Sequence, residues 1–157
     1  NLAVNDAEQA INEKYTLDKL ESWTSLSDKL KVFAGTGNYS LDFNMPAGKA
    51  DEWLLDLGKL CESAQVTLNG QKVGSVWSLP FQIPVGHYLK KGTNHLELAV
   101  TNLPANRIAD YDRRKVEWQI FYEINFVNVF YRPFSAADWK TMPSGLIGPV
   151  KLVPLTR

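Results

Sequence analysis

The sequence predicts an all-β fold, an antiparallel β-sandwich of the jelly-roll kind. Apolar and polar residues alternate with a period of two in several short segments, and Gly, Pro and Asn residues separate these segments. Short strands divided by closely spaced turns are typical of two packed antiparallel sheets. With 157 residues, the chain is long enough to bury one well-filled core.

The clearest expected element is a hairpin centred on Asn69-Gly70. Residues 64–68 and 71–77 alternate on either side of this pair. Asn and Gly both accept the positive φ angles that a type I′ turn requires, so the turn chemistry and the flanking pattern agree. Further strands are expected at residues 39–45, 53–57, 81–85, 95–102 and 149–155. Pro84 suggests that the strand at 81–85 lies at a sheet edge or ends there.

The first 21 residues depart from this alternation. Ala7, Ala10, Ile11 and Lys14 follow a helical spacing behind a potential Asp6 cap, which predicts a short helix over residues 6–14, with a linker as the alternative. We therefore expect a linker or short helix at residues 1–21 and one β-sandwich domain at residues 22–157.

Residues 103–143 are too numerous for a simple loop in a compact sandwich. Residues 116–127 alternate like an extended element. Four of the residues in this stretch also fit one face of a helix: Trp118, Phe121, Tyr122 and Asn125. Arg113-Arg114-Lys115 is interpreted as a solvated turn. Half of the 18 aromatic residues lie in this stretch: Tyr111, Trp118, Phe121, Tyr122, Phe126, Phe130, Tyr131, Phe134 and Trp139.

Aromatic rings beside planar polar side chains suit carbohydrate, because the rings stack on sugar C–H faces and Asn, Asp and Arg reach the hydroxyls. On this basis the candidate carbohydrate-binding residues are Trp77, Asn106, Arg107, Asp110, Tyr111, Trp118 and Trp139. Structural alternatives stay open. The aromatics could fill a satellite core or dock another domain, Trp77 could pack at the sandwich mouth, and Asn106 with Arg107 could clasp the backbone.

Four blocks of sequence resemble known glycosidase domains from about Leu20 onward. Residues 33–43 and residues 64–74, the latter with Trp77 and Pro80-Phe81, resemble the opening strand and the hairpin of the sugar-binding β-sandwich of glycoside hydrolase family 2. Residues 89–102 are similar to its next strand. Residues 100–103, Asn106-Arg107 and residues 143–150 most closely resemble the C-terminal β-sandwich of α-L-rhamnosidase-like glycoside hydrolases.

The resemblance implies a galactose-binding-like jelly roll that accompanies a catalytic barrel in a secreted or periplasmic polysaccharide-degrading enzyme. In these families the catalytic carboxylates lie on the barrel, and no position of the four blocks takes over that role. The expected function is a non-catalytic accessory domain, with the parent's catalytic domain as partner and an oligosaccharide as a further ligand. An independent carbohydrate-binding module is the alternative, and a self-contained glycosidase is a distant one.

Other chemistries find little support in the sequence. Seventeen basic residues balance 17 acidic ones, so we expect neither nucleic acid nor membrane as a partner. Cys61 is interpreted as a small buried or half-buried thiol, and His87 and His95 lack the spacing of a transition-metal site. The carboxylates at Asp110, Asp112, Glu117 and Glu123 are read as a chance cluster. No cofactor is expected, and calcium is left open because oxygen ligands leave little sequence signature.

Overall fold

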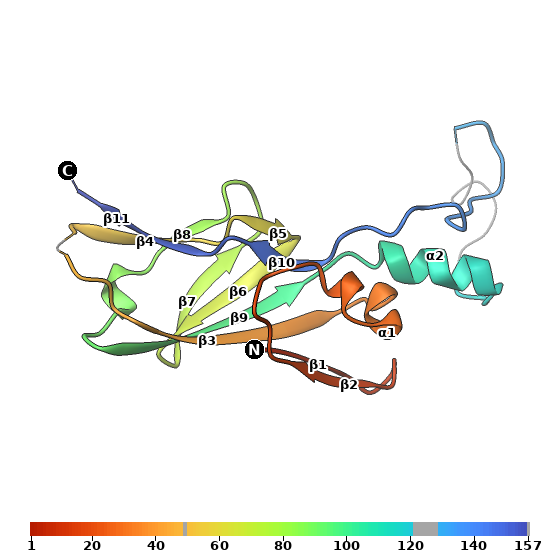
Figure 1. The fold of residues 1–157 in the computed structure, drawn as a ribbon. Helices are drawn as coiled ribbons and strands as arrows, with labels where there is room; N and C mark the ends of the chain where they lie inside the picture. Colours follow the sequence, from red (N-terminus) through yellow and green to blue (C-terminus); the bar gives the residue numbers. More distant parts are fainter. Residues whose placement is uncertain (49, 121–128, 157) are drawn as a thin grey trace.

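The computed structural model describes residues 1–48, 50–120 and 129–156, and it confirms the all-β antiparallel fold. A six-stranded sheet with the order β2-β1-β3-β9-β6-β7 forms one layer. The other layer consists of a three-stranded sheet, β11-β4-β8, and a two-stranded sheet, β10-β5 (Figure 1). The pairings within these sheets are antiparallel.

The first layer comprises β1 (Leu2–Asp6), β2 (Ile11–Tyr15), β3 (Thr36–Asn44), β6 (Ser63–Leu68), β7 (Gln71–Val76) and β9 (Thr93–Thr101). The second comprises β4 (Glu52–Asp56), β5 (Lys59–Cys61), β8 (Gln82–Pro84), β10 (Gly145–Gly148) and β11 (Lys151–Leu155). The helical elements are η1 (Trp23–Ser25), α1 (Asp28–Lys31), η2 (Gly86–Tyr88) and α2 (Ala105–Arg114).

The core lies between the two layers and follows the alternation of the strands. In β9, Leu96, Leu98 and Val100 are buried, whereas the residues between them are exposed or half-buried. Trp23 is fully buried and packs edge to face against Phe33, with ring centroids 5.5 Å apart. A strand whose apolar residues recur every second position buries one face, so the sequence pattern alone predicts which side chains reach the core.

The helix expected over residues 6–14 is wrong, because this stretch belongs to the β1–β2 hairpin. Strand β1 also pairs with β3, which buries Leu2, Val4 and Ile11 in the core. The Asp6 carboxylate accepts a hydrogen bond from the Gln9 amide at 2.9 Å and thereby closes the turn of the hairpin. Residues 1–21 therefore contribute two strands to the same sheet as residues 36–44.

The predicted hairpin at Asn69-Gly70 is confirmed. Strands β6 and β7 pair on either side of this turn, and the two turn residues have φ angles of 54° and 77°. The Asn69 side chain also donates to the Tyr88 carbonyl at 2.8 Å, which ties the turn to η2. Strand β8 lies at the edge of its sheet and ends at Pro84, as the missing amide donor of that proline predicted.

Residues 103–143, called the excursion below, open with α2, an element that we did not predict. Arg113 and Arg114 belong to the last turn of this helix, so the solvated turn expected there is wrong. The helix ends at Lys115, whose left-handed φ of 56° closes it. Of the stretch 116–127, residues 116–120 form neither a strand nor a helix. Residues 121–128 lie outside the described part of the chain, and the extended and helical interpretations stay predictions there.

Candidate functional site

The excursion extends from one end of the sandwich, with α2 nearest the body (Figure 1). Asn106 and Ala109 form the buried positions of this helix. Asn106 donates to the Met142 carbonyl and accepts from the Met142 amide, each at 2.8 Å. The polar clasp that the sequence suggested for Asn106 with Arg107 is present for Asn106, and it joins the start of the excursion to its end. The part expected of Arg107 is wrong, because its Nε donates to the Tyr111 hydroxyl and not to a backbone carbonyl.

Two further side chains of α2 hold the returning chain. The Asp112 carboxylate accepts from the Trp118 indole N–H at 2.7 Å and from the Ala136 amide at 2.6 Å. Arg113 donates to the carbonyls of Ala137 and Trp139 at 2.9 and 2.6 Å. Hydrogen bonds to charged groups are stronger than neutral ones, so these contacts fix residues 135–139 along the helix.

The described aromatic residues of the excursion differ in their surroundings. Trp118, Phe134 and Trp139 form a cluster in which Phe134 meets Trp118 at 6.4 Å and Trp139 at 5.8 Å, both nearly edge to face. Trp118 and Phe134 are half-buried and Trp139 is 42% exposed, so the three rings pack on one another without forming the buried satellite core that was one alternative from the sequence. Four large apolar residues on either side of residues 121–128 are 77–85% exposed and are together called the tip below: Ile120, Val129, Phe130 and Tyr131.

A polar cleft of about 290 Å³ lies between α2, the turn of the β1–β2 hairpin and α1. Helix α2 supplies Arg107, Asp110, Tyr111 and Arg114 to its lining, and the other elements supply residues that include Glu8 and Lys29. Three of the residues predicted to bind carbohydrate therefore meet in one cleft. Its lining carries three basic and two acidic side chains, which favours an anionic ligand slightly over a neutral one.

The polar groups of this cleft are partly engaged with one another. Arg114 binds Asp110 at 2.7 Å, four residues earlier on the helix. Arg107 donates from Nε to the Tyr111 hydroxyl at 2.7 Å, and its guanidinium carbon lies 5.0 Å from the Tyr111 ring centroid. The Arg114 guanidinium also lies over this ring, at 5.6 Å. Tyr111 therefore binds two cations and is a poor platform for sugar stacking.

Asp6 and Gln9 support the rim of the cleft. Gln9 donates to the Asp6 carboxylate and to the Ala34 carbonyl, at 2.6 and 2.8 Å. The pKa of Asp6 is lowered, chiefly because its carboxylate accepts the backbone and side-chain N–H groups of Gln9; the positive charge of Arg107 adds to this effect. Asp6 is thus held ionised on the rim.

The other predicted site residues lie apart from this cleft. Trp77 follows β7 and is 76% exposed, with Leu79 exposed nearby on the same loop. Trp118 and Trp139 belong to the aromatic cluster, and Asn106 is committed to Met142. Asp112 and Arg113 were missed as positioning residues, although their places in the last turns of an α-helix would have indicated them had α2 been recognised.

The remaining reactive groups are mostly engaged or exposed. Burial raises the pKa of the Cys61 thiol, which fits a half-buried, unreactive cysteine. His87 and His95 are exposed, and His95 Nδ1 lies 2.5 Å from Asp42. Across residues 1–48, 50–120 and 129–156, no group of three His, Cys, Asp or Glu side chains could hold a metal ion. None of the helices in these ranges has the length and apolarity needed to cross a bilayer.

Comparison with known proteins places this architecture among glycosidases. A protein named "Putative beta-glucuronidase" from Formosa agariphila is 33% identical over 159 residues, covering 88% of this chain and 14% of the relative. The structure of a rhamnosidase from Novosphingobium sp. PP1Y is 35% identical, with a TM-score of 0.68, covering 87% of this chain and 12% of that one. A GH2 beta-galacturonidase from Eisenbergiella tayi is 20% identical, with a TM-score of 0.51 over 66% of this chain and 18% of its own, and shares the fold.

The chain thus spans about one-seventh of the Formosa relative and one-eighth of the rhamnosidase. The family model described as glycosyl hydrolase 2 galactose-binding domain-like matches residues 27–147, from the N-cap of α1 to strand β10. This range includes the greater part of both layers and α2. The chain therefore belongs to the galactose-binding-domain-like family of glycosyl hydrolase 2.

Proposed function

We propose that this chain is a non-catalytic accessory domain of a larger glycoside hydrolase, and that the tip of the excursion docks it against the catalytic part. The observation that carries this proposal is the tip itself, where Ile120, Val129, Phe130 and Tyr131 are 77–85% exposed. Exposed apolar side chains gathered on one segment mark an interaction surface more often than scattered ones do. The far greater length of the relatives supplies a reason for such a surface.

The contacts beneath the tip favour docking. Asp112 and Arg113 bind the returning chain, and Asn106 closes the base of the excursion. A surface that is held in place before binding loses less conformational entropy on association. The hydrogen bonds of α2 hold residues 136–139, which follow the tip in the chain, and this favours docking because it limits the freedom of the segment that carries the tip.

The engagement of two carboxylates of the excursion, Asp110 and Asp112, supports a non-catalytic role. Glycoside hydrolysis uses a pair of carboxyl groups about 5–10 Å apart across the sugar. Asp110 is paired with Arg114, and Asp112 is occupied by Trp118 and the Ala136 amide. These carboxylates position other groups, and we assign the chemistry to the catalytic part, acting on rhamnosides or uronides as the names of the relatives suggest. Export to the periplasm or the medium completes the proposal, since polymeric glycans are met there.

The docking proposal is tested with the separately purified catalytic part of the parent enzyme. The chain should bind it, and replacing Phe130 and Tyr131 together by Ser should weaken the complex at least tenfold, since the loss of two buried aromatic anchors costs more than about 1.4 kcal/mol. The matched control replaces Trp77 and Leu79, which are as exposed but lie on the β7–β8 loop, and should leave the affinity unchanged. Equal affinities of the two variants, or turnover of an aryl rhamnoside or glucuronide by the chain alone, would contradict the proposal.

A second candidate function is direct oligosaccharide binding in the polar cleft. It is favoured by the meeting of Arg107, Asp110 and Tyr111 in a space of about 290 Å³, enough for one sugar unit. Titration calorimetry with an oligouronide should then show millimolar to micromolar binding that Arg107→Ala reduces. Trp118→Ala or Trp139→Ala should reduce binding only if the sugar extends to the aromatic cluster. A panel of acidic and neutral glycans that gives no heat would remove this candidate.

A further inference from the structure

Strand β3 has a free edge beside the N-terminal strand. It pairs with β9 over its whole length, Thr36–Asn44, but β1 covers only Gly37, Asn38 and Tyr39 on the other side. The ladder continues to Ser40, whose amide donates to the Asn1 carbonyl at 2.9 Å while the Asn1 nitrogen donates to the Ser40 carbonyl at 2.8 Å. Beyond Ser40, the described residues place no strand on this edge of β3.

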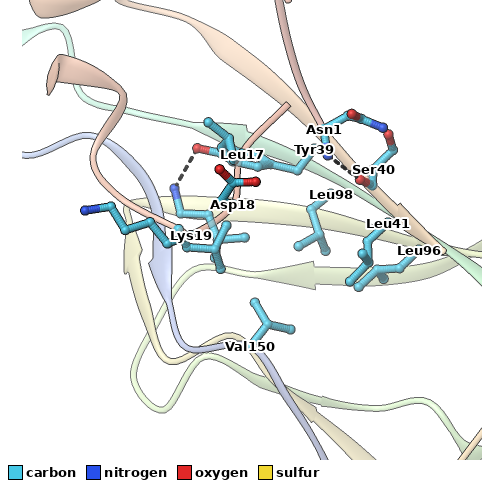
Figure 2. A pocket seen from close by; sticks show the side chains of 12 residues that line it. Asn1, Leu17, Asp18, Lys19, Tyr39, Ser40, Leu41, Leu96, Leu98 and Val150 are labelled. Carbon is cyan, nitrogen blue, oxygen red and sulfur yellow. Dashed lines mark hydrogen bonds between the residues drawn. The ribbon is translucent and has the colours of Figure 1, made fainter. Parts of the chain in front are cut away.

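An apolar pocket of about 180 Å³ opens at this edge, between the two layers. Figure 2 shows Leu41, Leu96 and Leu98 on one side of it and Val150 on the other. Leu41 pairs with Leu96 across the sheet, so it occupies the row of β3 that faces the core. Yet Leu41 is 55% exposed, whereas Tyr39, two residues earlier in the same row, is 6% exposed.

The exposure of Leu41 therefore marks a place where the six-stranded sheet, in the part of the chain that the structure describes, has no further strand beside β3. An inward-facing leucine of a sandwich is normally covered, because burial of such a side chain contributes about 1.5–3 kcal/mol. Here Asn1, Ser40 and Leu41 line the pocket where pairing with β1 stops, and residues 17–20, which follow β2, line it as well. The missing cover thus coincides with the point at which the ladder stops.

The register of β1 fixes where further residues would lie. Leu2 is opposite Tyr39, so Asn1 is opposite Ser40, and a residue joined to the Asn1 nitrogen falls opposite Leu41. Directly opposed residues project to the same face of a sheet, so its side chain points into the pocket. In an antiparallel sheet, every second residue of a strand directs its N–H and C=O groups toward the same neighbour. After Ser40, the next residue of β3 that directs these groups to the free edge is Asp42.

We propose that the free edge of β3 is completed by an extended strand that continues β1 backward from Asn1, with apolar residues opposite Leu41 and Phe43. Resting on the proposed function, the strand is a segment of the same larger enzyme, and its apolar residue opposite Leu41 fills the pocket. Continuity with the β1–β3 ladder favours this occupant over a small apolar ligand, which would leave the backbone groups of Asp42 unpaired. It also removes an open sheet edge, which natural proteins avoid.

The test joins a short extension to Asn1 of the full chain. The extension Lys-Val-Thr-Val places its valines opposite Leu41 and Phe43, and the control Val-Thr-Val-Lys has the same composition with the alternation shifted by one residue. The first should raise Tm by at least about 3 °C and slow amide exchange at Asp42, whereas the second should do neither. In the extended protein, Leu41→Lys should remove the rise in Tm. In the chain without an extension, the same substitution should change Tm little, because Leu41 is half exposed there.

Equal Tm values for the two extensions, or unchanged exchange at Asp42, would overturn the proposal. A concentration-dependent dimer of the chain without an extension, dispersed by Leu41→Lys, would overturn it in favour of edge pairing between two copies. An apolar compound that raises Tm more than the in-register extension would identify a ligand pocket, and it would also overturn the proposal. Because no catalytic part is present, these results are independent of whether the tip docks.

Discussion

Asn106 and Met142 exchange two hydrogen bonds, both 2.8 Å long, across 36 residues of chain. The Asn106 side chain is 5% exposed and provides both a donor and an acceptor to one peptide backbone. This contact closes the excursion at its base, because Met142 lies directly before the chain re-enters the second layer at β10.

Replacing Asn106 by Ala should destabilise the domain by about 1–3 kcal/mol, because the amide and carbonyl of Met142 lose the side chain with which they form two part-buried hydrogen bonds. Urea unfolding monitored by tryptophan fluorescence measures this loss. Amide exchange at Met142 should accelerate in the same variant. The control is Asn12→Ala, at an exposed position of β2. Equal unfolding free energies for the two variants would contradict a structural role for the clasp.

Gly37 and Trp23 meet so closely that an added methyl group would not fit. A Cβ built on Gly37 would lie 2.6 Å from the Trp23 Cζ3 atom, and this ring is fully buried. We expect Gly37→Ala to cost about 1–3 kcal/mol, because the core must shift to accept the methyl group. Differential scanning calorimetry should show the lowered Tm.

The matched control for Gly37→Ala is Gly74→Ala in β7. A Cβ at Gly74 would meet the Ile83 Cδ1 atom at 2.9 Å, which is the end of a flexible side chain that can turn away. Neither glycine has a positive φ, so backbone strain does not separate the two substitutions. A larger loss for Gly74→Ala than for Gly37→Ala would show that the packing around Trp23 is looser than the structure indicates.

The sequence predicts those elements whose signal is local. The turn at Asn69-Gly70 and the alternation of β9 need no distant partner to be recognised. By contrast, β2 reads Ile-Asn-Glu-Lys-Tyr, with too few apolar residues for a strand pattern. Its hairpin partner β1 is fixed by pairing with β3, a contact between residues more than 30 positions apart, and this tertiary pairing outweighed the helical spacing of residues 6–14.

The part of the candidate site that comes from one helix was predictable, because its residues follow a local spacing. Arg107 with Tyr111 and Asp110 with Arg114 are spaced four residues apart, as neighbours on a helix are, so one element presents them together. The opposite wall of the cleft comes from the hairpin turn and α1, and no local pattern relates Lys29 to Arg107. Trp77 was grouped with these residues by its chemistry alone, and the chain places it after β7, outside the cleft lining.

Because of Tyr39, the stability of the domain should fall as the pH rises in the alkaline range. Its hydroxyl oxygen is buried and accepts a hydrogen bond from the Leu146 amide at 3.0 Å. Burial raises the pKa of Tyr39 from 10.0 to about 12, because the phenolate would lose its hydration in the core. Since the unfolded state releases this proton first, the contribution of Tyr39 is fully present below pH 10 and is lost as the pH rises from 10 to about 12.

The Tyr39→Phe variant isolates this effect, since it lacks the titrating hydroxyl. At pH 8 the wild type should be more stable by about 1–3 kcal/mol, because the variant leaves the Leu146 amide unpaired. This advantage should shrink by about 2–3 kcal/mol as the pH approaches 12, because each pKa unit corresponds to about 1.4 kcal/mol. Urea titrations of both proteins at half-unit steps above pH 8 measure the difference. An advantage that stays constant through this range would show that the Tyr39 hydroxyl reaches water in the folded protein.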